Sequence, residues 1–127
     1  MKKLLTILAF ISLTGCSTIM DYFPSRWDAN QAKVITDIQQ SARRFDCKGD
    51  QLAQINALEK NIEWFEIYAK TKPTRDVANL TTTLVETVKE YQDRLAKGPV
   101  SPVYCEIKKK LFVQQADILA STVQGRF

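Results

Sequence analysis

The residues of this 127-residue chain that are best suited to chemistry are its three cysteines, Cys16, Cys47 and Cys105, and the chain contains no histidine. Without imidazole, no Cys-His or Ser-His pair can activate a nucleophile. The two cysteines that follow Cys16 are too few to hold a metal ion without histidine partners. The chemistry left to these thiols is lipid attachment and disulfide formation.

The acidic residues do not form a recognisable catalytic set. Glu63 and Glu66, like Glu86 and Glu90, are ordinary neighbours on a helix. No Gly-rich loop is present to bind a phosphate, and paired carboxylates of the glycosidase type need a cleft that short loops do not build. We therefore expect neither catalytic activity nor a cofactor or metal.

The residues before Cys16 have the layout of a secretion signal. Lys2 and Lys3 are followed by an apolar stretch at residues 4–13 and by Leu-Thr-Gly-Cys at residues 13–16. The apolar stretch is about ten residues long, whereas a helix needs about 20 to span a bilayer. The ending resembles the lipobox of bacterial lipoproteins. That resemblance implies cleavage before Cys16, a thioether-linked diacylglycerol on its sulfur and acylation of the new amino terminus, which together anchor a protein stably.

The segment after Cys16 bears on where the protein resides. An Asp directly after the lipidated cysteine would resemble an inner-membrane retention signal, but residue 17 is Ser. The periplasmic face of the outer membrane is therefore favoured. Residues 16–25 form a short tether with Tyr22 and Phe23 among its apolar side chains. This tether packs on the domain or rests at the lipid headgroups. Two alternatives to lipidation stay open, an ordinary cleaved signal or an uncleaved short anchor.

The charge balance gives little support for nucleic-acid binding. Removing residues 1–15 takes away two of the 18 basic residues and leaves a net charge of +2 against 14 acidic residues. The only basic run, residues 108–110, spreads around a helix instead of forming a stripe.

Residues 26–124 predict an all-α domain of four helices, followed by a tail at 125–127. Apolar spacing predicts helices near 26–45, 51–71, 75–97 and 102–124. The expected N-caps are Ser25, Asp50, Thr74 and Ser101. The expected core faces are Trp27, Gln31, Val34, Ile35, Ile38, Ala42 and Phe45 on the first helix; Leu52, Ile55, Leu58, Ile62, Phe65 and Ala69 on the second; Val77, Leu80, Leu84, Val88, Tyr91 and Leu95 on the third; and Val103, Tyr104, Ile107, Leu111 and Ile118 on the fourth.

Short linkers of about four to five residues make consecutive helices antiparallel neighbours, so an up-down four-helix bundle is predicted. In that bundle Cys47, at the end of the first helix, and Cys105, one turn into the fourth, lie at the same end of neighbouring helices. In an oxidising periplasm the two should form a disulfide. The alternative is a pair of free buried thiols.

The second and fourth helices each carry a further apolar face. These faces are Ala53, Ala57, Trp64, Ile67 and Tyr68 on the second helix and Cys105, Phe112, Ala116, Leu119 and Val123 on the fourth. Irregular packing could bury both faces, or the tether could cover one of them. Otherwise they form an exposed patch for a partner helix or strand, or for a second copy of the chain. Trp64, Ile67 and Tyr68 are the residues we expect to bind a partner.

Two classes of function follow. The first is a non-catalytic adaptor that binds another envelope protein. Its layout resembles the four-helix pilotins of type II secretion, which have a lipid anchor and a disulfide between their first and fourth helices and hold a secretin segment in a groove. The similarity covers the architecture of residues 26–124 without a residue motif, so it assigns no binding residues. The second class is a plasmid- or phage-encoded exclusion or inhibitor lipoprotein that blocks a receptor or an envelope enzyme.

Overall fold

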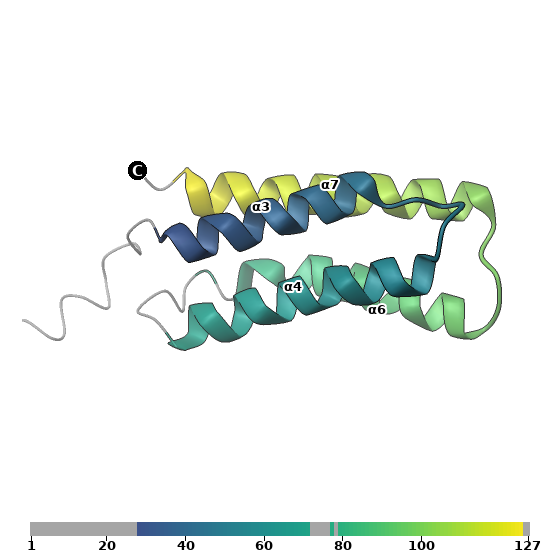
Figure 1. Ribbon diagram of the computed structural model, residues 1–127, viewed down its shortest axis with the longest axis horizontal. Coiled ribbons are helices and arrows are strands. Elements are labelled where there is room, and N and C mark those ends of the chain that lie inside the picture. The colour runs from purple at the N-terminus through teal and green to yellow at the C-terminus, as the bar shows by residue number, and fades with distance from the viewer. Residues whose placement is uncertain (1–27, 72–76, 78, 126–127) are drawn as a thin grey trace, which may run out of the picture.

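The computed structural model describes residues 28–71, 77 and 79–125 (Figure 1). The helices are α3 (Ala29–Arg44), α4 (Gln51–Thr71), α6 (Thr82–Ala96) and α7 (Pro102–Gln124), with a 3-10 helix, η2 (Asn79–Thr81), directly before α6. The prediction of an all-α domain with four packed helices is therefore confirmed. The predictions made for the signal peptide at 1–15, Cys16, the tether at 16–25, Ser25, Trp27 and Thr74 lie outside the described residues, as does most of the tail.

The four helices form a closed ring of neighbours. α3 packs against α4 and α7, and α6 packs against the same two helices. Consecutive helices run in opposite directions, so the α3–α4 and α6–α7 connections lie at one end of the bundle and the start of α3 lies at the other (Figure 1). Within the described ranges, none of the helices is both long enough and apolar enough to cross a membrane.

Local hydrogen bonds explain where the helices begin. The Asp28 carboxylate accepts from the backbone N–H groups of Asn30 and Gln31 at 2.8 and 3.1 Å and caps α3. α3 therefore begins at Ala29 and not near residue 26 as expected, because Asp28 is extended and does the capping. The predicted caps of α4 and α7 are confirmed, with Asp50 accepting from the backbone N–H of Ala53 and Ser101 from that of Tyr104.

The third helix differs from the prediction of one continuous helix over 75–97. Val77 is helical, but the 3-10 turn η2 comes between it and α6. Thr81 is buried, and its hydroxyl donates to the carboxylate of Glu66 on α4. Because the Thr81 side chain binds α4, it forms no capping hydrogen bond with the backbone of α6. The regular α-helix begins only at Thr82.

A group of aromatic rings fills the core near the loop-connected end of the bundle. Phe45, Tyr91 and Phe112 pack edge to face, with ring centroids 5.5 to 5.7 Å apart. Tyr91 donates to Oε1 of Gln51 at 2.6 Å. Burial, together with the neighbouring phenol of Tyr104, raises the pKa of Tyr91 to about 12, so this hydroxyl stays protonated at physiological pH. The remaining buried apolar residues are Ile35, Ile38, Ala42, Ile55, Leu58, Ile62, Phe65, Ala69, Val77, Leu84, Val88, Cys105, Ala116, Leu119, Ala120 and Val123.

The core face predicted for the fourth helix was wrong. α7 buries the stripe Cys105, Phe112, Ala116, Leu119 and Val123, whereas Val103, Ile107 and Ile118 are exposed and Tyr104 and Leu111 are half-buried. Both stripes are apolar, and the disulfide distinguishes them because it holds Cys105 on the side of α7 that faces the α3–α4 connection. Ala116 and Ala120 also lie on the buried side, where small side chains let the neighbouring helices pack closely. Leu52 and Leu80, also expected in the core, are exposed.

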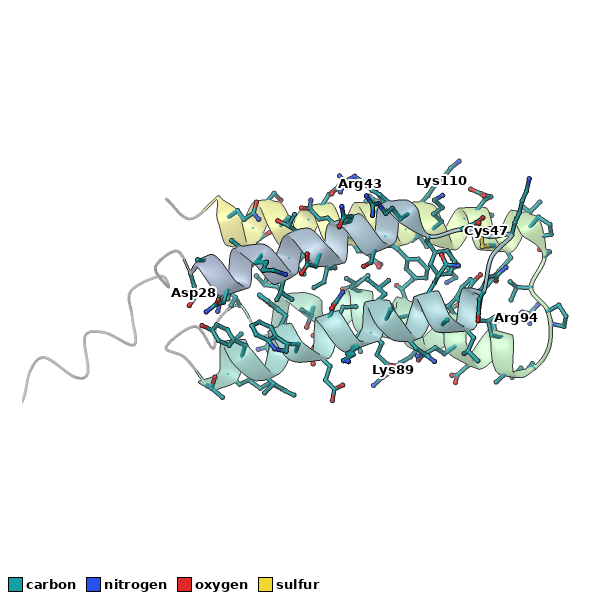
Figure 2. The ribbon with its side chains drawn as sticks, viewed as in Figure 1. Asp28, Arg43, Cys47, Lys89, Arg94 and Lys110 are labelled. Carbon is teal, nitrogen blue, oxygen red and sulfur yellow. A yellow bond between two sulfur atoms is a disulfide. The ribbon has the colours of Figure 1, made fainter. Side chains whose placement is uncertain are left out.

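The predicted disulfide is confirmed. Cys47 and Cys105 are bonded at an S–S distance of 2.06 Å, with their Cα atoms 5.8 Å apart. Cys47 lies at the end of the bundle where α3 turns into α4, and Asp28 marks the opposite end of α3 (Figure 2). The Cys47 carbonyl also accepts a hydrogen bond from Nε2 of Gln51 at 2.7 Å. The bond therefore joins the α3–α4 connection to α7 at the end that the two loops already close.

Candidate protein-binding surface

α4 carries two stripes with coiled-coil spacing, and only one of them is buried. The buried stripe is Ile55, Leu58, Ile62, Phe65 and Ala69. The second stripe, called here the outer seam of α4, also alternates between steps of four and three residues, which is the spacing of a and d positions in a heptad. The outer seam is Ala53, Ala57, Lys60, Trp64, Ile67 and Thr71, and all six residues are exposed.

Trp64 is the largest side chain of the outer seam, and its position is fixed by its neighbours. Its ring stacks on that of Tyr68, with centroids 4.7 Å apart and an interplanar angle of 11°. The Tyr68 hydroxyl donates to Oδ2 of Asp28 at 3.1 Å and accepts from Nδ2 of Asn30 at 3.0 Å. These bonds fix Tyr68 to the start of α3, so the indole of Trp64 stacks on a ring whose position is held. Trp64 itself remains 43% exposed to solvent.

The three residues predicted to bind a partner therefore differ in their surroundings. Trp64 and Tyr68 are brought together as a stacked pair, and Tyr68 is half-buried. Ile67 lies on the next turn of the outer seam from Trp64 and is 57% exposed. Trp64 and Ile67 are the apolar side chains that α4 offers at this end, and Tyr68 supports them from the side of α3.

A hollow lined by lysines borders the outer seam on the side of α3. It has a volume of about 320 Å³ and lies between α3 and α4, and it is called here the lysine hollow. Lys33 in its wall pairs with Asp37 at 2.7 Å, whereas Lys60 forms no ion pair with the described residues. The residues of its wall are Asn30, Lys33, Val34, Lys60, Asn61 and Trp64, and no carboxylate is among them.

A hollow of opposite charge borders the outer seam on the side of α6. It has a volume of about 340 Å³ and is called here the glutamate hollow. Glu59 accepts from Nε2 of Gln92 at 2.7 Å, whereas Glu63 forms no ion pair with the described part of the chain. The residues of its wall are Glu59, Ile62, Glu63, Glu66, Val85 and Lys89, so α4 separates a basic flank from an acidic one.

α7 presents a second apolar strip on the outside of the bundle. Val103, Ile107 and Ile118 are more than half exposed. A shallow hollow of about 850 Å³ runs beside Ile118 along the side of α7 next to α3. Its wall has charges of both signs, including Asp117, which pairs with Arg43 at 2.7 Å. This surface therefore has no consistent charge of its own.

One lysine of α7 is buried and paired within the bundle. Lys108 is buried to 8% exposure, its Nζ lies 2.6 Å from Oε2 of Glu90, and it also lies over the ring of Tyr104 at 5.6 Å from the centroid. Across residues 28–71, 77 and 79–125, no group of three His, Cys, Asp or Glu side chains is placed to hold a metal ion.

Sequence reasoning proposed Trp64, Ile67 and Tyr68 as partner-binding residues and did not predict the two charged hollows beside them. Each hollow combines residues from two helices, so its charge depends on which helices are neighbours. The signal available in the sequence was the pair of opposite charges on α4, Lys60 in the outer seam and Glu63 beside it. No family model matches this sequence, and no match is found among curated proteins or solved structures.

Proposed function

We propose that this protein is a non-catalytic lipoprotein that binds another envelope protein, as an adaptor or pilotin-like factor at the periplasmic face of the outer membrane. The proposal combines the lipobox-like sequence at residues 13–16 with a small helical bundle joined by one disulfide. The observation that supports partner binding most strongly is the exposed outer seam of α4 with Trp64 at its centre.

The argument rests on the fact that α4 does not need the outer seam in order to fold. Its opposite face already supplies the core residues, including Ile62 and Phe65. An exposed tryptophan beside an exposed isoleucine adds nothing to that core. Large aromatic side chains held in one orientation are the residues that dominate binding energy at protein interfaces. Trp64, stacked on an anchored Tyr68, has these properties.

Replacing Trp64 and Ile67 together with alanine is expected to weaken partner binding by about 2 kcal/mol or more, the effect of removing an interface anchor. The free energy of unfolding should change little, because both side chains are exposed. The measurement is photo-crosslinking in the intact envelope from a benzophenone amino acid at Ala57, with mass-spectrometric identification of the product and a melting curve of the same variant.

Leu52→Ala is the matched control, because Leu52 is on the same helix and, at 55% exposed, is as accessible as Ile67 but lies outside the outer seam. It should leave both crosslinking and stability unchanged. Loss of folding in the Trp64→Ala/Ile67→Ala variant would place these residues among those that stabilise the bundle. Unchanged crosslinking in that variant would contradict the binding role.

The anchor is tested separately. Cys16→Ser removes the sulfur that would carry the diacylglycerol, so labelling with a fatty-acid probe should disappear and the protein should leave the outer-membrane fraction. One chain binds membranes only marginally, and stable anchoring needs more than one. A mature chain that does not begin at Cys16, or unchanged membrane association of the unlabelled variant, would refute the anchor.

A further inference from the structure

We infer that the outer seam of α4 receives an amphipathic α-helix of another protein, whose flank over the lysine hollow is acidic and whose flank over the glutamate hollow is basic. This inference rests on the proposed function and specifies the partner's chemistry. It follows from three properties of the same surface: the spacing of the outer seam, the size of its residues and the opposite charges of its two borders.

The spacing favours a helix over an extended strand. Residues at alternating steps of four and three face one side of a helix and form the holes into which the side chains of a second helix insert. The outer seam keeps this spacing from Ala53 to Thr71, nearly the full length of α4. An extended segment repeats every two residues and would lose register with these holes after a few positions.

The residue sizes favour a partner with large side chains at one end. Ala53 and Ala57 leave room above the first half of α4, whereas Trp64 and Ile67 project from the second half. A matching helix therefore carries large apolar residues over the two alanines and small ones over the tryptophan. This asymmetry gives the bound helix one preferred direction along α4.

The charges beside the outer seam indicate which charges the two flanks of the partner helix carry. Lys60 belongs to the outer seam and lines the lysine hollow, whereas Glu63 lines the glutamate hollow, and neither forms an ion pair among the described residues. The wall of the lysine hollow has two lysines and no carboxylate, and that of the glutamate hollow has three carboxylates and one lysine. Complementary charges at the edges of a helix–helix seam set partner choice and orientation.

The same charges argue against a second copy of this chain. In a parallel two-fold pairing through the outer seam, Lys60 of one copy would face Lys60 of the other in the same layer. In an antiparallel pairing, the lysine hollows would face each other, as would the glutamate hollows. The parallel pairing would place each lysine hollow opposite a glutamate hollow, but it buries two Lys60 side chains against each other in the seam. The antiparallel pairing brings like charges together along both flanks, so a different chain with divided charge fits better.

The test uses the full chain and three synthetic helical peptides about three heptads long, stapled because short helices are marginal in water. They share one apolar stripe, with large residues at one end and small ones at the other. The divided peptide has Glu on one flank and Lys on the other, in the arrangement that matches α4. The second peptide has Glu on both flanks, and the third has Lys on both. We expect the divided peptide to bind about tenfold more tightly than either of the others, with the difference shrinking as salt is added.

Lys60→Glu replaces the unpaired positive charge of the lysine hollow with a negative one and leaves Lys33 paired with Asp37, so the preference should move to the peptide with Lys on both flanks. Lys97→Glu is the control, because it makes the same change of net charge at an exposed position in the α6–α7 connection. It should leave the preference unchanged.

Equal binding of the three peptides, or an equal response to Lys97→Glu, would overturn the inference. So would a dimer of the full chain in sedimentation that Trp64→Ala dissociates, since that outcome assigns the outer seam to a second copy. The proposed function fails independently if the envelope crosslink from Ala57 does not depend on Trp64 and Ile67, whichever peptide binds best.

Discussion

Replacing Cys47 and Cys105 together with alanine should lower the free energy of unfolding by about 3 to 4 kcal/mol and the melting temperature by more than about 10 °C. The bond joins residues 58 positions apart, so it removes much of the freedom of the unfolded chain. Differential scanning calorimetry of oxidised protein, with the variant alongside, measures both quantities.

Treating the unaltered protein with a thiol reductant supplies the control, because it breaks the bond while leaving every atom of the core in place. It should reproduce most of the loss. If the alanine variant and the oxidised protein melt at the same temperature, the bond does not stabilise the fold and the chain-entropy argument fails.

Phe112→Ala should cost about 3 to 5 kcal/mol of unfolding free energy, because it leaves a cavity among packed rings. Phe112 is fully buried and contacts the edges of Phe45 and Tyr91 at centroid distances of 5.5 and 5.7 Å. Chemical denaturation monitored by circular dichroism gives the difference directly.

Ile118→Ala provides the comparison on the same helix. Ile118 is 57% exposed and belongs to the stripe that sequence spacing had placed in the core. Its removal should change stability by no more than about 0.5 kcal/mol, as for other surface substitutions. The reverse ranking, with Ile118→Ala the more damaging, would mean that α7 faces the opposite way.

The buried faces of α3 and α4 could be predicted from the sequence, and that of α7 could not. α3 buries Ile35, Ile38 and Ala42 as expected, because its other faces are polar. α7 has apolar residues on both sides, so its periodicity gave no basis for choosing between Phe112 and Ile118. The choice depends on contacts with other helices, which periodicity within one helix does not contain.

Loop length and cap chemistry were more informative than stripe composition. The short connection after Cys47 and the Ser-Pro start of the fourth helix placed both cysteines at one end, and the disulfide followed from that arrangement. The interruption before α6 was missed for the opposite reason. It depends on a hydrogen bond between Thr81 and Glu66, two residues that no local pattern connects.

The position of the disulfide also determines how the bundle responds to mechanical load. If the chain is held at its amino-terminal side while a partner pulls on α4, the tension enters α3 at Asp28, the end farthest from Cys47 (Figure 2). Peeling of α3 then starts where side-chain contacts such as those of Asp28 and Asn30 with Tyr68 resist it. At Cys47 the covalent link divides the tension, because the load can then reach α4 directly along the chain and also through Cys105 and α7.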